Sequence, residues 1–275
     1  MRRRVPFWGL LFAGLLLASA AMADRALQMK SLLDALKIAE TVEVMQQEGD
    51  IYGTSLVTSM GLETDAALWG RTVRRIYDAE KMQALIITEI ESALSETDLA
   101  PLLAYYGSQD AARVVALELS ARRVFLDPDT EALAIARSEG LRADGAPLMA
   151  RIETLIADSD LIGRNVAGAL NSELMFYRGL NDGGAFDLSE DEMLAAVWAR
   201  EEELRASTRA WMEGFLSMAY QQLSSQQLED YAALWRTPEG RDLNRAVFAG
   251  FDRMYEDISY LLGLAVAREM RGEKL

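Results

Sequence analysis

Apolar residues recur at steps of three and four along nearly the whole chain, the spacing of one face of an α-helix. The clearest row consists of Leu243, Val247, Phe251, Met254, Ile258 and Leu261. A second row widens that stripe and consists of Phe248, Tyr255, Leu262 and Val266. A stripe this wide predicts a long helix that packs against several neighbours. Because no segment alternates like a strand, we expect an all-α, multi-helix bundle of about ten helices.

Residues suited to helix N-caps precede several of these segments. In a capping box, a hydroxyl accepts a free backbone amide while a glutamate or glutamine three residues later reaches back. This spacing occurs at Ser189–Glu192 and Ser224–Gln227, and a looser version occurs at Ser95–Asp98. In Asp127–Pro128 and Thr237–Pro238 the cap is followed by proline, which suits the first helical position because it has no N–H group.

Two stretches of the chain, 94–125 and 223–254, resemble each other when one is shifted by 129 residues. In each, a capped helix ends in an aromatic residue, Tyr106 or Trp235, and a new cap and a longer helix follow. Few positions are identical, so two unrelated helical hairpins are the alternative. We favour an ancient duplication.

This repeat divides the chain after its leader into two parts. The stretch 139–147 is the richest in helix breakers and lies near the middle. We therefore expect helical pseudo-repeats at 24–146 and 147–275 that share a core within one compact domain.

The first 23 residues have the parts of a secretory signal peptide. The basic start Met1–Arg4 precedes a short apolar run, Val5–Ala18, and Ser19–Ala23 ends in an Ala-x-Ala exit. The apolar run is shorter than the roughly 20 residues that span a bilayer as a helix. We predict cleavage after Ala23 and a periplasmic location; retention as an uncleaved anchor is the alternative.

The absence of histidine and cysteine removes several chemistries. It rules out Ser-His-Asp triads, Cys-His dyads, and zinc sites built on imidazole or thiolate. The formal charge of −15 repels phosphate backbones, so we expect no nucleic-acid partner. We also expect no cofactor, no metal site and no catalytic residue, and no later segment is apolar enough to span a membrane.

Carboxylates are abundant but form no evident site. The runs Glu190–Glu192 and Glu201–Glu203 point in different directions on a helix, which favours solvated faces. The stretch that begins at Asp127 fails as an EF-hand calcium loop, because Ala132 and Ser138 occupy its glycine and glutamate positions.

Two groups of residues are candidates for binding a partner or an anion. Arg164, Asn171 and Arg178 lie on one stripe of the predicted helix 161–180, where arginine could bind a carboxylate. The alternative for this stripe is pairing with nearby acidic residues. The second group, at a predicted helix start near which an anion could bind, is Trp235, Arg236 and Arg241. A purely structural corner anchored by the tryptophan is the favoured interpretation of this group.

Three segments, "LLDALKIAETVEVMQQEG", "RNVAGALNSELMFYRGLNDGG" and "LWRTPEGRDLNRAVFAGFDRMYEDISYLLG", resemble a family of exported bacterial helical proteins catalogued as a domain of unknown function. Its most recognisable element, Y/W-x-[ST]-P-x-G, corresponds to Trp235–Gly240. In the first copy, Gln109 and Ala111 replace the proline and the glycine. The resemblance implies an all-α fold and a periplasmic address, and it implies no reaction and no catalytic residues.

These features favour a non-catalytic interaction or envelope-support module that binds an unknown protein or an apolar ligand. The alternative is a hydrolase that acts on envelope glycans with Asp or Glu alone. A homodimer formed through an apolar patch is a third interpretation.

If the leader is cleaved as predicted, the exported protein begins at Asp24. N-terminal sequencing of protein recovered from the cell envelope checks this expectation. A chain that still carries residues 1–23 would indicate the uncleaved anchor instead.

Overall fold

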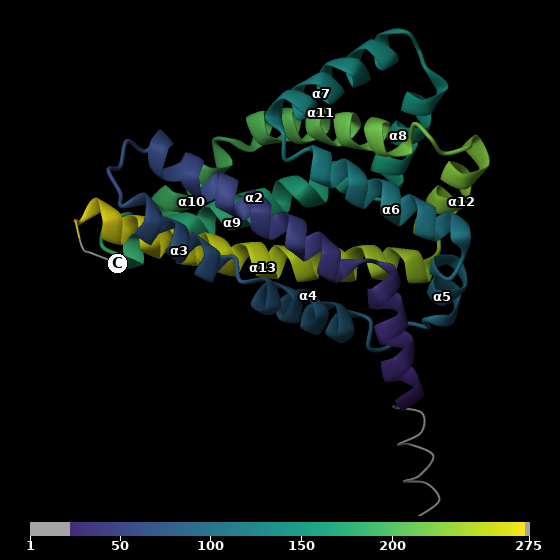
Figure 1. Ribbon diagram of the computed structural model, residues 1–275, viewed down its shortest axis with the longest axis horizontal. Helices are drawn as coiled ribbons and strands as arrows, with labels where there is room; N and C mark the ends of the chain where they lie inside the picture. Colours follow the sequence, from purple (N-terminus) through teal and green to yellow (C-terminus); the bar gives the residue numbers. More distant parts are fainter. Residues whose placement is uncertain (1–22, 273–275) are drawn as a thin grey trace, which may run out of the picture.

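The computed structural model describes residues 23–272, and most of them belong to helices (Figure 1). A helical segment at 23–35 is followed by twelve helices, and no strand occurs in the described part of the chain. The all-α prediction is therefore confirmed. The predicted signal peptide, apart from Ala23, lies outside the described residues. The helices are α2 (Ile38–Ser59), α3 (Ala66–Ile76), α4 (Ala79–Ala93), α5 (Ala100–Tyr106), α6 (Gln109–Val124), α7 (Pro128–Ala143), α8 (Pro147–Asp158), α9 (Leu161–Asp182), α10 (Glu190–Trp198), α11 (Glu201–Tyr220), α12 (Ser225–Trp235) and α13 (Pro238–Met270).

Four of the five predicted caps form as expected. Both capping boxes, at Ser189 and Ser224, are complete. Thr237 caps α13 by accepting a hydrogen bond from the third helical amide, and Asp127 caps α7. Short polar side chains at these positions thus set where the helices begin.

The looser capping box at Ser95–Asp98 does not form. α5 begins instead at Ala100, whose N–H donates to the Asp98 carboxylate at 3.0 Å. The reason is that the preceding residues still belong to the turn that closes α4, where the Thr97 amide donates to the Leu94 carbonyl.

The most extensive helix contact joins α9 and α13, which lie side by side through the middle of the molecule (Figure 1). Two glycines face each other where these helices are closest. A Cβ atom built on Gly179 would lie 2.2 Å from the Tyr260 carbonyl oxygen, and one on Gly263 would lie 2.2 Å from the Phe176 carbonyl oxygen. The two backbones touch directly, so neither position has room for a side chain.

The buried face of α13 follows the predicted rows with one exception. Leu243, Met254 and Ile258 are buried, but Leu261 is 44% exposed while Leu262 is 1% exposed. Near this end α13 packs on α9 at Gly263, which turns the buried face toward Leu262.

Two clusters of buried apolar side chains form the core. The first draws mainly on 23–35, α2 to α5 and α13, and the second mainly on α6, α8, α9, α11 and α12. Helices of the segments 24–146 and 147–275 pack on each other. From the second segment α13 packs on α4 of the first, and α6 and α7 of the first pack on α11 of the second. The first cluster thus needs α13 from the second segment to be complete, and the origin of the two segments by duplication stays a prediction.

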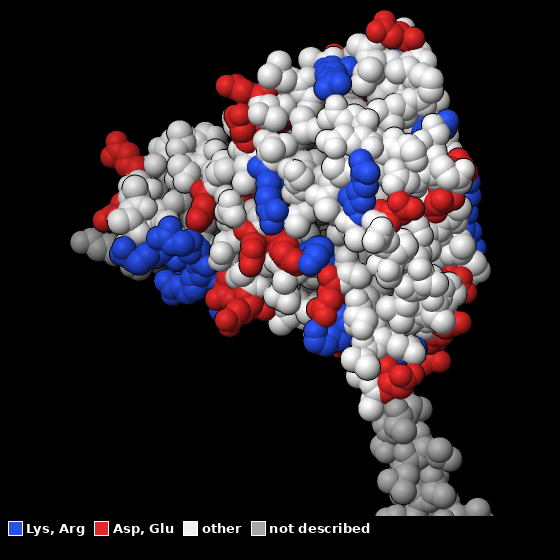
Figure 2. Space-filling view, turned by 45° about the vertical axis from the view of Figure 1, so that its right-hand side comes forward, with Lys and Arg blue, Asp and Glu red and all other residues white. Residues whose placement is uncertain are grey.

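Acidic and basic side chains are interspersed on the face shown in Figure 2. One cluster of basic side chains lies at the left of this view. Within residues 23–272, none of the helices combines the length and the apolar character that a membrane crossing requires.

Substituting Gly263→Ala should lower the free energy of unfolding by about 1–3 kcal/mol, because the new methyl group would overlap the α9 backbone. Gly140→Ala is the matched control. Gly140 lies within α7 with nothing near its Cβ position, so this change should raise stability by about 0.5–1 kcal/mol. Urea unfolding of both variants measures the difference, and equal effects would contradict the close approach of α9 and α13.

Candidate functional site

A groove with a volume of about 750 Å³ lies between α2, α9 and α13. Phe186, in the loop before α10, and Arg200, at the start of α11, contribute to its edge. It is large enough for a small organic molecule, since such sites typically measure about 300–1,000 Å³.

Aromatic side chains dominate the walls of this groove. Tyr52 and Phe186 are 51% and 42% exposed, which places them at the rim, while the other aromatic side chains are more buried. Exposed aromatic residues at a concave surface are typical of binding sites. The full set of aromatic side chains is Tyr52, Phe176, Tyr177, Phe186, Phe248, Phe251 and Tyr255, and aliphatic contacts come from Leu56, Met60, Leu180 and Leu262.

Asp252 is a half-buried carboxylate within this apolar lining. It faces Gly168 of α9, where a Cβ atom would lie 2.4 Å from Asp252 Oδ1, so the glycine makes room for the carboxylate. Burial raises the pKa of Asp252 from 3.8 to about 6, the nearby charge of Glu256 adds to the rise, and Arg164 opposes it. A carboxylate held at such a pKa in a groove is a candidate functional group.

The other charged groups of the groove neutralise each other. Arg200 donates to Glu173 at 2.8 Å, and this hydrogen bond raises the pKa of Arg200. The pair joins α9 to the start of α11. Because Glu173 is paired with Arg200, Asp252 is the one acid among the groove's lining residues that has no ion pair.

The predicted stripe on α9 is not brought together as one site. Arg178 pairs with Glu190 at the start of α10, and the side chain of Asn171 is exposed. Arg164 lies 5.6 Å above the ring of Phe248 at the groove's border. The contact of Arg178 favours the alternative of pairing with nearby acidic residues, whereas Arg164 contributes to the field around Asp252.

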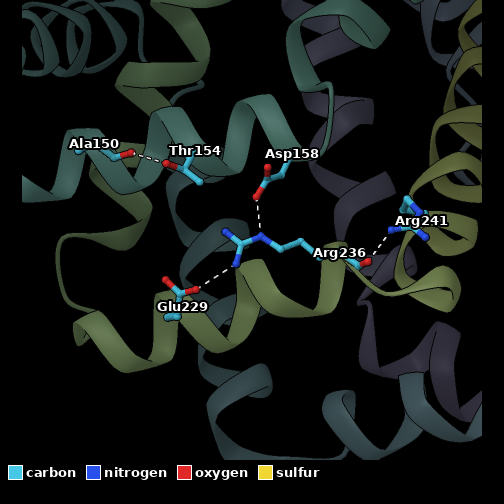
Figure 3. A network of polar contacts seen from close by, with 6 residues as sticks. All are labelled: Ala150, Thr154, Asp158, Glu229, Arg236 and Arg241. Carbon is cyan, nitrogen blue, oxygen red and sulfur yellow. Dashed lines mark hydrogen bonds and ion pairs between the residues drawn. The ribbon is translucent and has the colours of Figure 1, made fainter.

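The corner that follows α12 is occupied by its own ion pairs (Figure 3). Arg236 reaches Asp158 of α8 at 2.7 Å and Glu229 at 3.0 Å, and its backbone carbonyl accepts a hydrogen bond from Arg241. Trp235 packs edge-on against Tyr231, with ring centroids 5.5 Å apart. These contacts favour a structural corner over anion binding.

Sequence reasoning missed the groove, although a signal was present. Phe248 and Tyr255 belong to the second apolar row of α13, and their spacing alone predicts only packing against neighbouring helices. Asp252 lies between them, one turn after Phe248, so an acid interrupts an aromatic stripe. An acid in such a stripe is a signal for a candidate site, because burying a carboxylate without a partner costs free energy.

Comparison with models of known protein families, with curated proteins and with solved structures gave no match. The resemblance to exported proteins of unknown function therefore stays a prediction. No group of three or more acidic side chains suited to a metal ion occurs within residues 23–272.

Replacing Asp252→Asn should stabilise the protein by about 1 kcal/mol near neutral pH, after allowance for the partial exposure of this group. The folded state holds its proton up to about pH 6, whereas the unfolded chain loses it near 3.8. Stability of the natural chain therefore falls as pH rises through this window, and the asparagine variant avoids that loss. Unfolding titrations at neutral pH and below about pH 4 compare the two chains. A gain of equal size at both pH values would indicate a packing effect instead of a charge effect.

Proposed function

We propose that this protein is a non-catalytic binding module that holds an apolar or aromatic ligand in the groove between α2, α9 and α13. The observation that carries this proposal is the concave lining of seven aromatic side chains with a single unpaired carboxylate. Flat rings offer large contact areas at a small cost in conformational entropy, so a ligand would gain most of its affinity from apolar contact.

Asp252 would fix the orientation of the ligand. Its side chain can accept a hydrogen bond from an amine, amide or hydroxyl of the ligand, and it can donate one when protonated below about pH 6. Because charging a half-buried acid costs free energy, its presence here is better explained by recognition than by stability.

The alternative, a glycan hydrolase that uses two carboxylates, has weaker support. Asp252 and Glu173 both line the groove, but Arg200 already binds Glu173. Few other polar side chains line it, and the amide of Asn165 donates to its own helix at Leu161. A glycan, which carries hydroxyl groups on every ring, would leave many of them without a partner.

We further propose that the protein acts outside the cytoplasm as an interaction or envelope-support module. The support comes from residues 1–23, in which a basic start is followed by an apolar run and then by an Ala-x-Ala motif, the order typical of a signal peptide. An apolar-ligand groove fits an envelope, where lipids and other apolar molecules are plentiful.

Filling the groove tests the binding function. Ala169 of α9 lines the groove, whereas Ala167 on the same helix is exposed. Ala169→Phe should weaken binding of the fluorescent apolar probe phenylnaphthylamine by about tenfold or more, because the new ring occupies the space of the ligand. Ala167→Phe is the matched control and should leave the affinity unchanged. If the natural chain does not bind the probe, or if both variants bind it as the natural chain does, the groove is not an apolar binding site.

A further inference from the structure

A second cavity, of about 260 Å³, lies where α2, α5, α6, α11, α12 and α13 meet. It is distinct from the groove, although Phe251 lines both. Aromatic rings surround one acidic side chain, Glu118 of α6. We call this set the aromatic cage, and its members are Tyr106, Glu118, Phe215, Tyr231, Trp235 and Phe251.

Glu118 is held in a fixed position by two tyrosines. The hydroxyl of Tyr220 donates to Oε1 at 2.5 Å, and the hydroxyl of Tyr231 donates to the same oxygen at 3.0 Å. The ring of Tyr231 is in turn stacked on Tyr105, with centroids 6.1 Å apart. Both bonds end at one oxygen, so the carboxyl group keeps capacity to accept a further bond, for example from a hydroxyl group of a ligand.

The one basic side chain that lines this cavity is already paired with an acid. Arg122 lines the same cavity, but its Nε and Nη2 atoms donate to the two carboxylate oxygens of Glu48 at 2.8 and 2.7 Å. A bidentate pair of this kind is strong and specific. Among the described residues no basic side chain pairs with Glu118, so the cavity presents its carboxyl group next to aromatic rings without a compensating positive charge.

Burial raises the pKa of Glu118, and the two tyrosine hydroxyls oppose this shift. An organic cation in the cavity would also favour the ionised carboxylate, since opposite charges stabilise each other most where water is scarce. Bound cation and ionised acid would thus reinforce each other.

We propose that the aromatic cage binds a small organic cation, a quaternary or methylated ammonium group, with Glu118 as its counter-ion. Aromatic faces attract such cations through their quadrupoles. A bare metal ion fits poorly, because calcium and magnesium require about six oxygen ligands and the cage supplies one carboxylate.

The test compares choline with its uncharged isostere 3,3-dimethylbutan-1-ol, in which carbon replaces the nitrogen. Calorimetry on the natural chain should show choline binding at least about tenfold tighter than the alcohol, because only choline carries the charge that the cage recognises. If the natural chain binds neither compound, or binds both equally, the proposal is wrong.

Glu118→Gln removes the charge and keeps an acceptor for both tyrosine hydroxyls, so this variant should bind choline and the alcohol with similar, weak affinity. Asp230→Asn is the matched control, because Asp230 is an exposed acid on α12 that does not line the cavity. This control should keep the preference for choline. Loss of the preference in Asp230→Asn to the same extent would mean that overall charge, and not the cage, attracts the cation. The comparison of the two compounds on the natural chain remains decisive even if Glu118→Gln does not fold.

Discussion

The close approach of α9 and α13 is the constraint on which the rest of the molecule depends. Gly179 and Gly263 let the two backbones touch, and this contact joins α13, which belongs to the first core cluster, to α9, which belongs mainly to the second. The groove follows directly from it, because Phe176 and Tyr177 of α9 and Tyr255 and Leu262 of α13 form its walls. A larger residue at the contact would separate the helices and change the groove as well as the core.

Both binding proposals rest on the same physical pattern, an acid placed among aromatic rings. Asp252 and Glu118 each lose hydration on folding, and in each the cost appears as a raised pKa. Two other partly buried acids have basic partners, since Glu173 pairs with Arg200 and Glu48 pairs with Arg122. Acids that the fold leaves without a basic partner are the strongest indication of ligands in a chain that has neither histidine nor cysteine.

Helical periodicity and caps predicted the class of the fold and most helix starts, since both depend on residues within a few positions of one another. Tertiary placement depends on distant pairs, and the sequence does not reveal these. Nothing local indicates that Gly168 faces Asp252, or that Glu118 meets tyrosines more than a hundred residues away. For the same reason Arg178 and Arg236 looked available from sequence, although Glu190, Asp158 and Glu229 bind them in the fold.

The packing of α13 against helices of the segment 24–146 also determines when the molecule can fold. A polypeptide emerges from the ribosome, or from a membrane pore, with its N-terminus first. The helices α2 to α5 share the first core cluster with α13, the 33-residue helix that follows them much later in the chain. This cluster cannot form until α13 has been synthesised. Contacts so far apart in sequence form slowly and leave apolar surface open in the meantime. The first core cluster, and the groove that α13 lines, can therefore form only after α13 has been synthesised.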